Sequence, residues 1–331
     1  MPLDWSPLVA FVRRHNRVLL TTHVRPDGDG LGSMLALGEA LEHLGKQVRR
    51  VIPSRLPPRY EFMDPGRTIE VFSPAITHDY DAVMVLDTGT WNQLDSVAGY
   101  VGESPAEKVV IDHHRTQDDL GATRFVDVAA AATGEMICDA IAALGVPLSP
   151  AMARNLFVAL AWDTGWFRHP NATEPIYNQA GRLIAAGANP TVIHEELYER
   201  KTLPALKLQG RLLDRIETRA GGRVSFSHVV FADYAETGAI PLDTEDLINF
   251  PRSIAGVEVA LIFMEQRDGT IKVSFRARRA DVGQLAEKFG GGGHRLAAGA
   301  TLPGPLEETR ERVLTAVLAA VELLELANGV A

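Results

Sequence analysis

Strand-like runs of apolar residues alternate with helical patterns over the first half of the chain. The runs predict buried strands at 17–22, 48–52, 82–86 and 108–111, and the patterns predict helices at 30–45, 131–144, 150–161 and 174–186. This alternation indicates a mostly parallel sheet with helices on both faces, an α/β layer fold. Open α/β sheets bind ligands beyond the carboxyl ends of their strands. The polar residues that follow three of these runs are therefore candidates for one site.

A second set of elements follows a charged helical stretch at about 190–217. Strands are expected near 223–231, 257–265 and 270–277, and helices near 243–250, 281–288 and 305–326. A length of 331 residues fits about two domains. We expect an N-terminal α/β domain at 1–188, a helical linker at 189–218 and a smaller C-terminal α/β domain at 219–331.

The overall charge and the cysteine count narrow the function classes. The chain has 33 Lys and Arg against 42 Asp and Glu, a net charge of −9. Coating long duplex DNA depends on neutralising many phosphates, so that function is disfavoured. Cys138 is the single cysteine, which excludes an internal disulfide and fits a reducing compartment. With no targeting pattern and no apolar run long enough to span a bilayer, we expect a cytoplasmic protein without a membrane partner.

The first candidate site segment follows the run at 17–22. His23, Asp27 and Asp29 lie within seven residues, on a loop that leads into a helix. Mixed imidazole and carboxylate ligands suit Mn, Fe or Zn better than Ca. The alternative is an Asp-Gly turn that caps the helix. The glycines at 28, 30 and 32 permit a tight turn and close backbone approach. They imitate a dinucleotide-binding fingerprint, but the third comes one residue early and Asp29 would repel a pyrophosphate.

Acids and histidines also follow the next two buried runs. Asp87 comes directly after 82–86 and is either a bridging metal ligand or the N-cap of the next helix. Asp112, His113 and His114 follow 108–111. Adjacent side chains on a strand point to opposite sides, so we expect one histidine to bind metal and the other to face substrate. Asp112 is a candidate to orient an imidazole. The alternative is a solvated polar turn.

A fourth segment places Asp163 at the end of a helical pattern. A helix C-terminus disfavours an anion unless a cation compensates, and a metal would do so. An exposed loop aspartate is the alternative. Together the four segments offer six donors, enough for two metals that share a bridging carboxylate: His23, Asp27, Asp29, Asp87, His113 and Asp163. Paired ions about 3.5–4 Å apart activate water for in-line phosphoryl displacement.

The C-terminal part contains a local basic segment. Residues 270–295 hold six Lys and Arg but two acids, and they include Arg276 and a glycine run before His294. Glycine amides approach phosphate closely and arginine binds it in bidentate fashion. No Lys-Ser or Lys-Thr follows the glycines, so this is not a P-loop. The alternative is a hinge loop beside a solvated basic face.

These motifs, in this order, resemble those of the DHH phosphoesterase family. His23-x-x-x-Asp27-x-Asp29, Asp87, Asp112-His113-His114 and Asp163 are similar to its four motifs, and the glycine run with residues 294–299 looks like the DHH-associated C-terminal domain of the first subtype. The likeness covers nearly the whole chain. The length is similar to the stand-alone branch of nanoRNases and 3′-phosphoadenosine-5′-phosphate (PAP) phosphatases. Trp162 departs from the family pattern, which commonly has a small or hydroxyl residue there.

The resemblance implies two Mn²⁺ ions and an active-site cleft between the two domains, the first catalytic and the second substrate-binding. One ion would be held by His23, Asp27 and Asp87. The other would be held by Asp29, Asp87, His113 and Asp163. The implied catalytic residues are Asp87, Asp112 and His114, with His114 facing the scissile phosphate. The implied substrate-binding residues are Ser33, Arg276, Gly291, Gly292, Gly293 and His294.

We therefore expect a hydrolase that degrades dinucleotides and other short single-stranded RNA to mononucleotides, and extend this expectation to PAP, a nucleoside bisphosphate. The alternatives are turnover of cyclic or linear dinucleotide second messengers, a pyrophosphatase, and a non-catalytic nucleotide-binding module. The sequence does not determine the oligomeric state, and a homodimer is possible.

Overall fold

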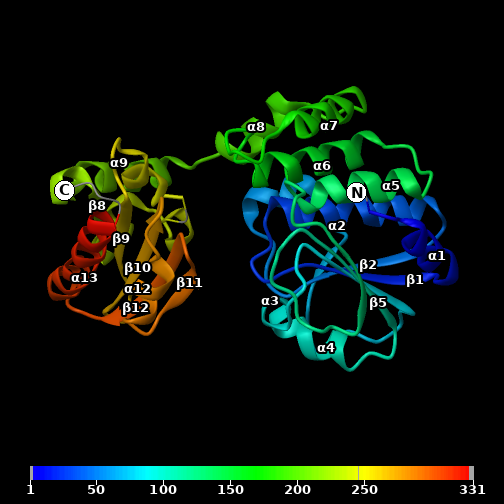
Figure 1. The fold of residues 1–331 in the computed structure, drawn as a ribbon, viewed down its shortest axis with the longest axis horizontal. Helices are drawn as coiled ribbons and strands as arrows, with labels where there is room; N and C mark the ends of the chain where they lie inside the picture. The colour runs from blue at the N-terminus through cyan, green and yellow to red at the C-terminus, as the bar shows by residue number, and fades with distance from the viewer. Residues whose placement is uncertain (1–2, 245, 328–331) are drawn as a thin grey trace. The chain divides into compact units, whose positions relative to one another are not determined.

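The computed structural model describes residues 3–244 and 246–327 and divides into two compact units (Figure 1). The N-unit comprises Met1–Arg200 and the C-unit Lys201–Ala331. Their boundary falls inside the stretch expected to be a helical linker. That stretch forms two helices, α8 (Pro190–Tyr198) in the N-unit and α9 (Leu203–Asp214) in the C-unit.

The N-unit is built on a six-stranded sheet in the order β3-β2-β1-β4-β5-β6, and every neighbouring pair is parallel. The strands are β1 (Arg17–Thr21), β2 (Gln47–Ile52), β3 (Ile69–Val71), β4 (Ala82–Leu86), β5 (Glu107–Asp112) and β6 (Ala122–Val126). The chain runs outward from β1 through β2 to β3 and then returns to β4 on the other side of β1. The strand order therefore reverses between β1 and β4.

Helices cover both faces of this sheet, as expected for the fold class. In Figure 1, α2, α5 and α6 lie together on one side of the sheet, and α3 and α4 lie on the other. The helices of the N-unit besides α8 are α1 (Ser6–Arg14), α2 (Gly28–His43), α3 (Trp91–Leu94), α4 (Ala98–Gly102), α5 (Thr133–Ala143), α6 (Pro150–Asp163) and α7 (Glu174–Ala185). The start of α6 is set by Ser149, whose hydroxyl accepts from the Met152 amide, and by a proline at its first position.

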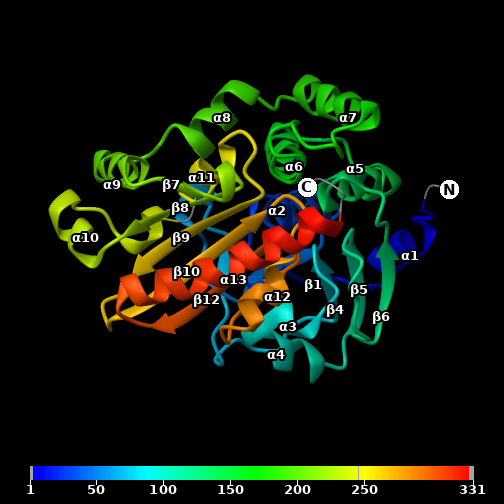
Figure 2. The same ribbon diagram turned by 60° about the vertical axis from the view of Figure 1, so that its left-hand side comes forward.

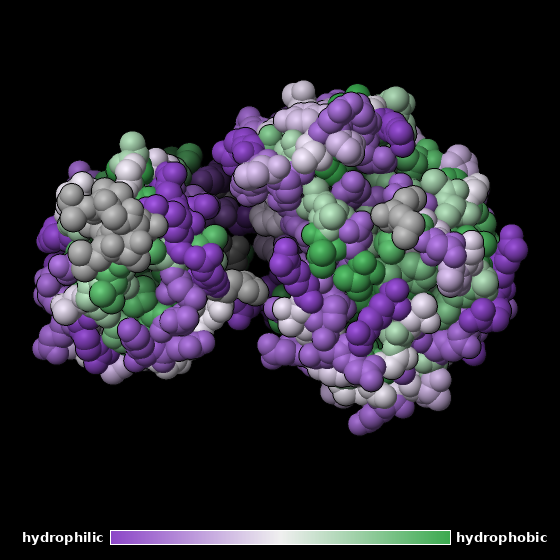
Figure 3. Space-filling model, viewed as in Figure 1, coloured by the Kyte–Doolittle hydropathy of each residue, from purple (hydrophilic) through white to green (hydrophobic). Residues whose placement is uncertain are grey.

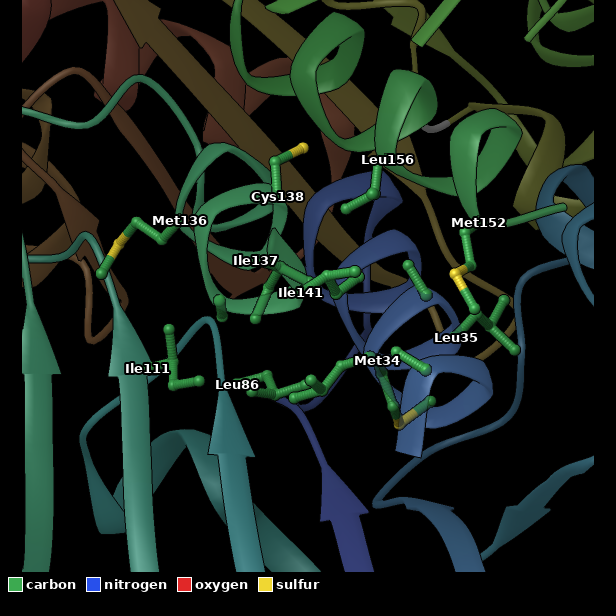
Figure 4. Packing of buried hydrophobic residues seen from close by; sticks show 14 of the residues in the cluster. Met34, Leu35, Leu86, Ile111, Met136, Ile137, Cys138, Ile141, Met152 and Leu156 are labelled. Atoms are coloured by element: carbon green, nitrogen blue, oxygen red, sulfur yellow. The ribbon is translucent and has the colours of Figure 1, made fainter. Parts of the chain in front are cut away.

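The central strands alternate their side chains between two apolar cores. Leu86 and Ile111 pack against α2, α5 and α6 (Figure 4), and Val85 and Val110 pack against the other helical layer. All four side chains are fully buried. Strands buried on both faces are continuous apolar runs, which is why the sequence revealed them.

The C-unit contains a second six-stranded sheet in the order β11-β12-β10-β9-β8-β7. The β8–β9 pair is parallel and the other pairs are antiparallel. Its strands are β7 (Glu217–Arg219), β8 (Val224–Val229), β9 (Val259–Glu265), β10 (Thr270–Ala277), β11 (Gly292–His294) and β12 (Ala297–Pro303). Its helices besides α9 are α10 (Phe231–Thr237), α11 (Asn249–Ser253), α12 (Val282–Glu287) and α13 (Leu306–Ala327).

Both faces of the second sheet carry a core. Figure 2 shows α13 running along one face of the sheet, where Phe226 and Phe275 are buried with residues of α12 and α13. The opposite face packs against α9, α10 and α11. Along β10 the odd-numbered residues Ile271, Val273 and Phe275 enter the α13 core. The polar residues between them therefore lie on the α11 face.

Several elements differ from the sequence expectations. Strands β3, β6, β11 and β12 and helix α1 were not foreseen, and the expected helix at 243–250 is a short 3₁₀ turn (Pro241–Thr244) followed by α11. Strand β6 is an edge strand with exposed polar residues. Strand β12 reads Ala-Ala-Gly-Ala-Thr-Leu-Pro, which lacks the β-branched run that marks a strand.

The surface in Figure 3 is largely hydrophilic, with apolar residues gathered near the middle of the visible face of the N-unit. Among the described residues, no helix combines the length and the apolar character needed to span a bilayer.

Candidate metal centre

Three neighbouring strands bring the predicted ligands to one edge of the N-terminal sheet. His23 lies two residues beyond β1, Asp87 directly follows β4, and His113 directly follows β5. These strands are adjacent in the order β1-β4-β5 and parallel, so their carboxyl ends meet. The point where the strand order reverses is where open α/β sheets bind ligands.

The loop after β1 both caps a helix and supplies candidate ligands. Asp27 is the N-cap of α2, and its Oδ1 accepts from the amides of Asp29 and Gly30 at 2.9 and 3.2 Å. Asp29 faces α5 instead, and its two carboxylate oxygens accept from the amides of Thr133 and Gly134 at 2.6 and 2.8 Å. The first turn of α5 thus fixes the Asp29 carboxylate. Capping and ligand presentation are not exclusive here.

The glycines of this loop serve close packing and not a turn. All three lie inside α2, and none of them has a positive φ. A Cβ on Gly30 would lie 2.3 Å from Thr22 Oγ1, and one on Gly32 would lie 2.3 Å from the Asn155 carbonyl oxygen. The expectation of a tight turn is wrong because the helix begins at Gly28. Close backbone approach is confirmed.

His23 presents one ring nitrogen to two carboxylates. Its Nδ1 is 3.0 Å from the Val24 carbonyl oxygen, which can only accept, so Nδ1 carries the hydrogen. Its Nε2 is 3.4 Å from Asp87 Oδ2 and 3.6 Å from Asp27 Oδ1. A carbonyl that fixes the tautomer is the usual support of a metal-binding histidine.

His113 repeats this arrangement on the other side of Asp87. Its Nδ1 lies 3.2 Å from the Ala130 carbonyl oxygen. Its Nε2 is 3.1 Å from Asp163 Oδ2, 3.6 Å from Asp87 Oδ1 and 3.8 Å from Asp29 Oδ2. This Nε2 is buried, and none of these contacts, nor any other among the described residues, has the geometry of a hydrogen bond. A buried ring nitrogen that faces three carboxylates without a hydrogen bond is in the surroundings that a cation between them would satisfy.

The electrostatics of the cluster lead to the same inference. Burial opposes a charged His23, but hydrogen bonds to Asp27 and Asp87 outweigh it and raise the pKa of His23 to about 11. Burial and then repulsion from neighbouring carboxylates raise the pKa of Asp29 well above its ordinary value. Burial also raises the pKa of Asp87. Without metal, bound protons offset the negative charge of the crowded carboxylates. Divalent cations would offset that charge in their place.

Within the part of the chain that the structure describes, donor atoms that lie within 4.8 Å of one another form three groups of metal-ligating residues. The groups are His23 with Asp27 and Asp87, Asp29 with His113 and Asp163, and Asp87 with His113 and His114. Asp87 belongs to two groups, as a bridging carboxylate would. The residues present therefore fit two divalent ions of the kind that mixed imidazole and carboxylate donors select.

Asp87 is held in an unusual backbone conformation. Its φ is 61°, in the left-handed region that non-glycine residues seldom adopt. The Asp87 amide donates to the Ile111 carbonyl at 3.0 Å, and Oδ1 accepts from the Thr133 hydroxyl at 2.9 Å. The side chain is 3% exposed. Neighbouring structure thus enforces a strained conformation, as is common at functional sites.

The two histidines after β5 lie together. Their ring centroids are 4.6 Å apart in an edge-to-face arrangement, so the expectation that they point to opposite sides is wrong. Strand β5 ends at Asp112, and strand alternation does not extend to His113 and His114. His114 is half exposed, and its Nδ1 lies 2.7 Å from Oδ1 of the fully buried Asp112. This hydrogen bond, with burial opposing it, raises the pKa of His114.

Three supporting residues were missed in the sequence. Thr133 and Gly134 fix Asp29 and Asp87 from the start of α5, and Gln117 Nε2 donates to Asp112 Oδ2 at 2.5 Å. The contacts of Thr133 and Gly134 join residues 46 to 105 positions apart, so no local pattern marks them, whereas Gln117 lies only five positions from Asp112. One indirect signal exists at Gly89, where a Cβ would lie 1.8 Å from Gln117 Oε1.

Ser33 is fully buried in α2, and its hydroxyl donates to Asp29 Oδ1 at 3.3 Å. It thus supports a predicted metal ligand, and its expected contact with substrate stays a prediction.

The predicted phosphate-binding residues of the C-unit lie on β10, on β11 and, for Gly291, directly before β11. Arg276 is half-buried on the α11 face and donates to the Phe275 carbonyl at 3.0 Å. Among the described residues it has no carboxylate partner. Burial, and then the nearby Arg252, lower its pKa. Part of the glycine run is a strand that pairs with β12, and a Cβ on Gly291 would lie 2.2 Å from the Gly299 carbonyl oxygen.

Comparison with known proteins agrees with this arrangement. Residues 17–160 match the DHH family N-terminal domain and residues 225–323 match the DHHA1 domain. The chain is 34% identical over 309 residues to the bifunctional oligoribonuclease and PAP phosphatase NrnA of Thermus thermophilus, covering 91% of this chain and 89% of that protein.

Two solved structures share the fold. An exopolyphosphatase-related protein from Bacteroides fragilis has a TM-score of 0.89 at 24% identity, over 96% of this chain and 95% of that one. RecJ from Thermus thermophilus in complex with Mn²⁺ has a TM-score of 0.55 at 16% identity, over 96% of this chain and 55% of that one. The resemblance read from the motifs is confirmed: the chain belongs to the DHH family and has a DHHA1 domain in its C-terminal part.

Proposed function

We propose that this protein is a metal-dependent phosphoesterase that degrades dinucleotides and other short single-stranded RNA to mononucleotides and removes a phosphate from PAP. The observation that carries the proposal is Asp87, a strained and buried carboxylate shared by His23 on one side and His113 on the other. A bridged two-metal arrangement is what in-line phosphoryl displacement uses. The named activities of the Thermus relative support the substrate class.

The donor set supports two divalent ions, with Mn²⁺ the first choice. Asp27, Asp87 and His23 would hold one ion, and Asp29, Asp87, His113 and Asp163 the other. Ions bound there would polarise the phosphoryl oxygens and activate the attacking water. The Mn²⁺ complex of RecJ supports this choice of metal.

The protein's own groups perform the remaining tasks. Asp112 accepts hydrogen bonds from His114 Nδ1 and from the Gln117 side-chain amide, so the His114 ring is held in one orientation. The Nε2 of His114 then shares a proton with an oxygen of the reacting phosphoryl group. The half-exposed His114 ring suits contact with substrate, and the buried Asp112 suits orienting that ring.

We assign the binding of a second phosphate or of the base to the C-unit. Arg276 is a guanidinium without a carboxylate partner among the described residues, and Arg252 adds positive charge near it. The backbone of Gly291, Gly292, Gly293 and His294 lies on the neighbouring hairpin. Arginine and glycine amides are the groups that bind phosphate.

The proposal is tested by a product time course with purified protein and Mn²⁺. The substrates are a 5′-phosphorylated diribonucleotide, PAP and cyclic di-AMP, each with a chelator control. Rapid mononucleotide release from the first, with phosphate release from the second, is expected. Preference for the cyclic substrate would replace the proposal with second-messenger turnover, and no turnover of any substrate would refute it.

The matched variants are Asp87→Asn and Asp95→Asn. Asp95 also has a positive φ, 47°, but it is exposed and lies outside the metal centre. Activity should be lost in the first variant and kept in the second. Equal loss in both would show a fold effect instead of a role of Asp87 at the centre.

A further inference from the structure

Trp162 occupies a position between two segments of the metal centre. It is the penultimate residue of α6 and precedes Asp163, whose carboxylate lies 3.1 Å from His113 Nε2. A Cβ on Gly28, the residue between Asp27 and Asp29, would lie 2.9 Å from Trp162 Cβ. The Trp162 side chain therefore starts directly beside two segments that carry predicted ligands, the Asp27–Asp29 segment and Asp163.

The indole ring is held from one side and remains partly exposed. Tyr60, on the 3₁₀ helix η1 (Pro58–Met63), meets it edge-on with ring centroids 5.5 Å apart and an interplanar angle of 78°. Tyr60 itself is 2% exposed and fixed in the core. The Arg59 guanidinium carbon lies 6.0 Å from the indole centroid. A positioned aromatic ring with a cation beside it is the pairing that binds single-stranded nucleotides.

Core packing alone does not account for this side chain. The residues of α6 just before it are Val158, Ala159, Leu160 and Ala161, all fully buried, whereas Trp162 is only partly buried against that core. A large aromatic side chain here leaves polarisable surface exposed beside the metal ligands.

We propose that Trp162 stacks on the nucleobase next to the scissile phosphate and makes the enzyme select for substrates that carry a base there. The Arg59 guanidinium would bind the phosphate of the same nucleotide. This inference rests on the proposed function and deepens it, because it names a group that determines specificity. The chemical class of the ligand is a nucleoside phosphate with an intact base, and a sugar phosphate would be a poor substrate.

The test compares a 5′-phosphorylated diadenylate with two analogues, each lacking the base of one nucleotide. Base–aromatic stacking predicts that kcat/KM of the wild type falls roughly 5- to 150-fold when the stacked base is absent. Trp162→Leu keeps apolar bulk without a flat ring, and should lose most of this preference while turning over the analogue like the wild type. Trp162→Tyr should keep much of it.

Trp166→Ala is the matched control. Trp166 lies four residues after Trp162, and its ring packs edge-to-face against Phe157 and His194. It should leave the base preference unchanged. A purely structural role of Trp162 would lower turnover of all substrates by the same factor in Trp162→Leu. That result, or an unchanged preference in the variant, would overturn the inference.

A binding readout separates this inference from the proposed function. Adenosine 5′-monophosphate, but not ribose 5-phosphate, should quench the indole fluorescence of the wild type, and the quenching should be lost in Trp162→Leu. If the wild type hydrolyses no substrate yet shows this quenching, the proposed function fails and the stacking site stands. Quenching that is equal in wild type and variant contradicts the stacking site, whatever the enzyme hydrolyses.

Discussion

Thr133 is the residue whose replacement tests the architecture of the metal centre most finely. It is fully buried at the start of α5, its hydroxyl donates to Asp87 Oδ1 at 2.9 Å, and its amide donates to Asp29 Oδ2 at 2.6 Å. Thr133→Val removes the hydroxyl and keeps the side-chain shape and the amide. The variant thus separates the support of Asp87 from that of Asp29.

The expected magnitude follows from the loss of one hydrogen bond to a buried carboxylate. Such bonds stabilise by about 1.5–3 kcal/mol. For a unit of about 200 residues that loss lowers the melting temperature by roughly 3–12 °C in chelator. Supporting groups of this kind typically change metal affinity or activity by about 10–100-fold. We expect a Mn²⁺ half-saturation shifted upward within that range.

The assay is a Mn²⁺ titration of diribonucleotide turnover, with thermal unfolding measured in chelator on the same samples. Thr133→Ser is the matched control because it keeps the hydroxyl, and its Mn²⁺ half-saturation should stay close to that of the wild type. Wild-type Mn²⁺ dependence in Thr133→Val would refute the reasoning that this hydroxyl positions Asp87.

Three further predictions concern the packing of Gly30, the ion pairs of Asp233 and the stabilising effect of bound metal. Gly30→Ala places a Cβ 2.3 Å from Thr22 Oγ1, so it should lower Mn²⁺ affinity at least tenfold in a titration. Gly99→Ala, where a Cβ meets nothing within 4 Å, should not. Asp233 is buried, and although burial opposes it, hydrogen bonds from arginines lower its pKa to about 2. Its stabilising effect, about 2 kcal/mol, is present above pH 3.8 and lost as pH falls toward 2, so urea unfolding of Asp233→Asn should show lower stability at pH 7 and a weaker acid dependence. Chelator should lower the melting temperature of the Mn²⁺-loaded wild type by several degrees but leave Asp87→Asn nearly unchanged, and equal shifts would contradict metal binding at this centre.

Much of the N-unit could be predicted because its central strands are buried on both faces. Runs such as 82–86 and 109–111 are wholly apolar for that reason, and each leads directly into a polar residue at the sheet edge. The six proposed donors come from four separate segments, and the fold brings them together around Asp87. Parallel strands make this predictable, because their carboxyl ends share one edge.

Other features could not be predicted from local patterns. The edge strand β6 and the small-residue strand β12 have no apolar run, because pairing in the sheet and not burial defines them. The contact between the rings of His113 and His114 depends on where β5 ends, which is a detail of the backbone. Support of Asp87 by Thr133 joins residues 46 positions apart, a relation that only the folded chain creates.

The proposed function requires that one centre holds two divalent ions with Asp87 between them. The most direct measurement is calorimetric titration of the chelator-treated protein with Mn²⁺, combined with electron paramagnetic resonance of the loaded sample, for wild type and Asp87→Asn. We expect two ions per chain and an exchange-coupled spectrum in the wild type, with the coupling lost in the variant. A single uncoupled ion in the wild type, or the same coupled pair in Asp87→Asn, would contradict this expectation.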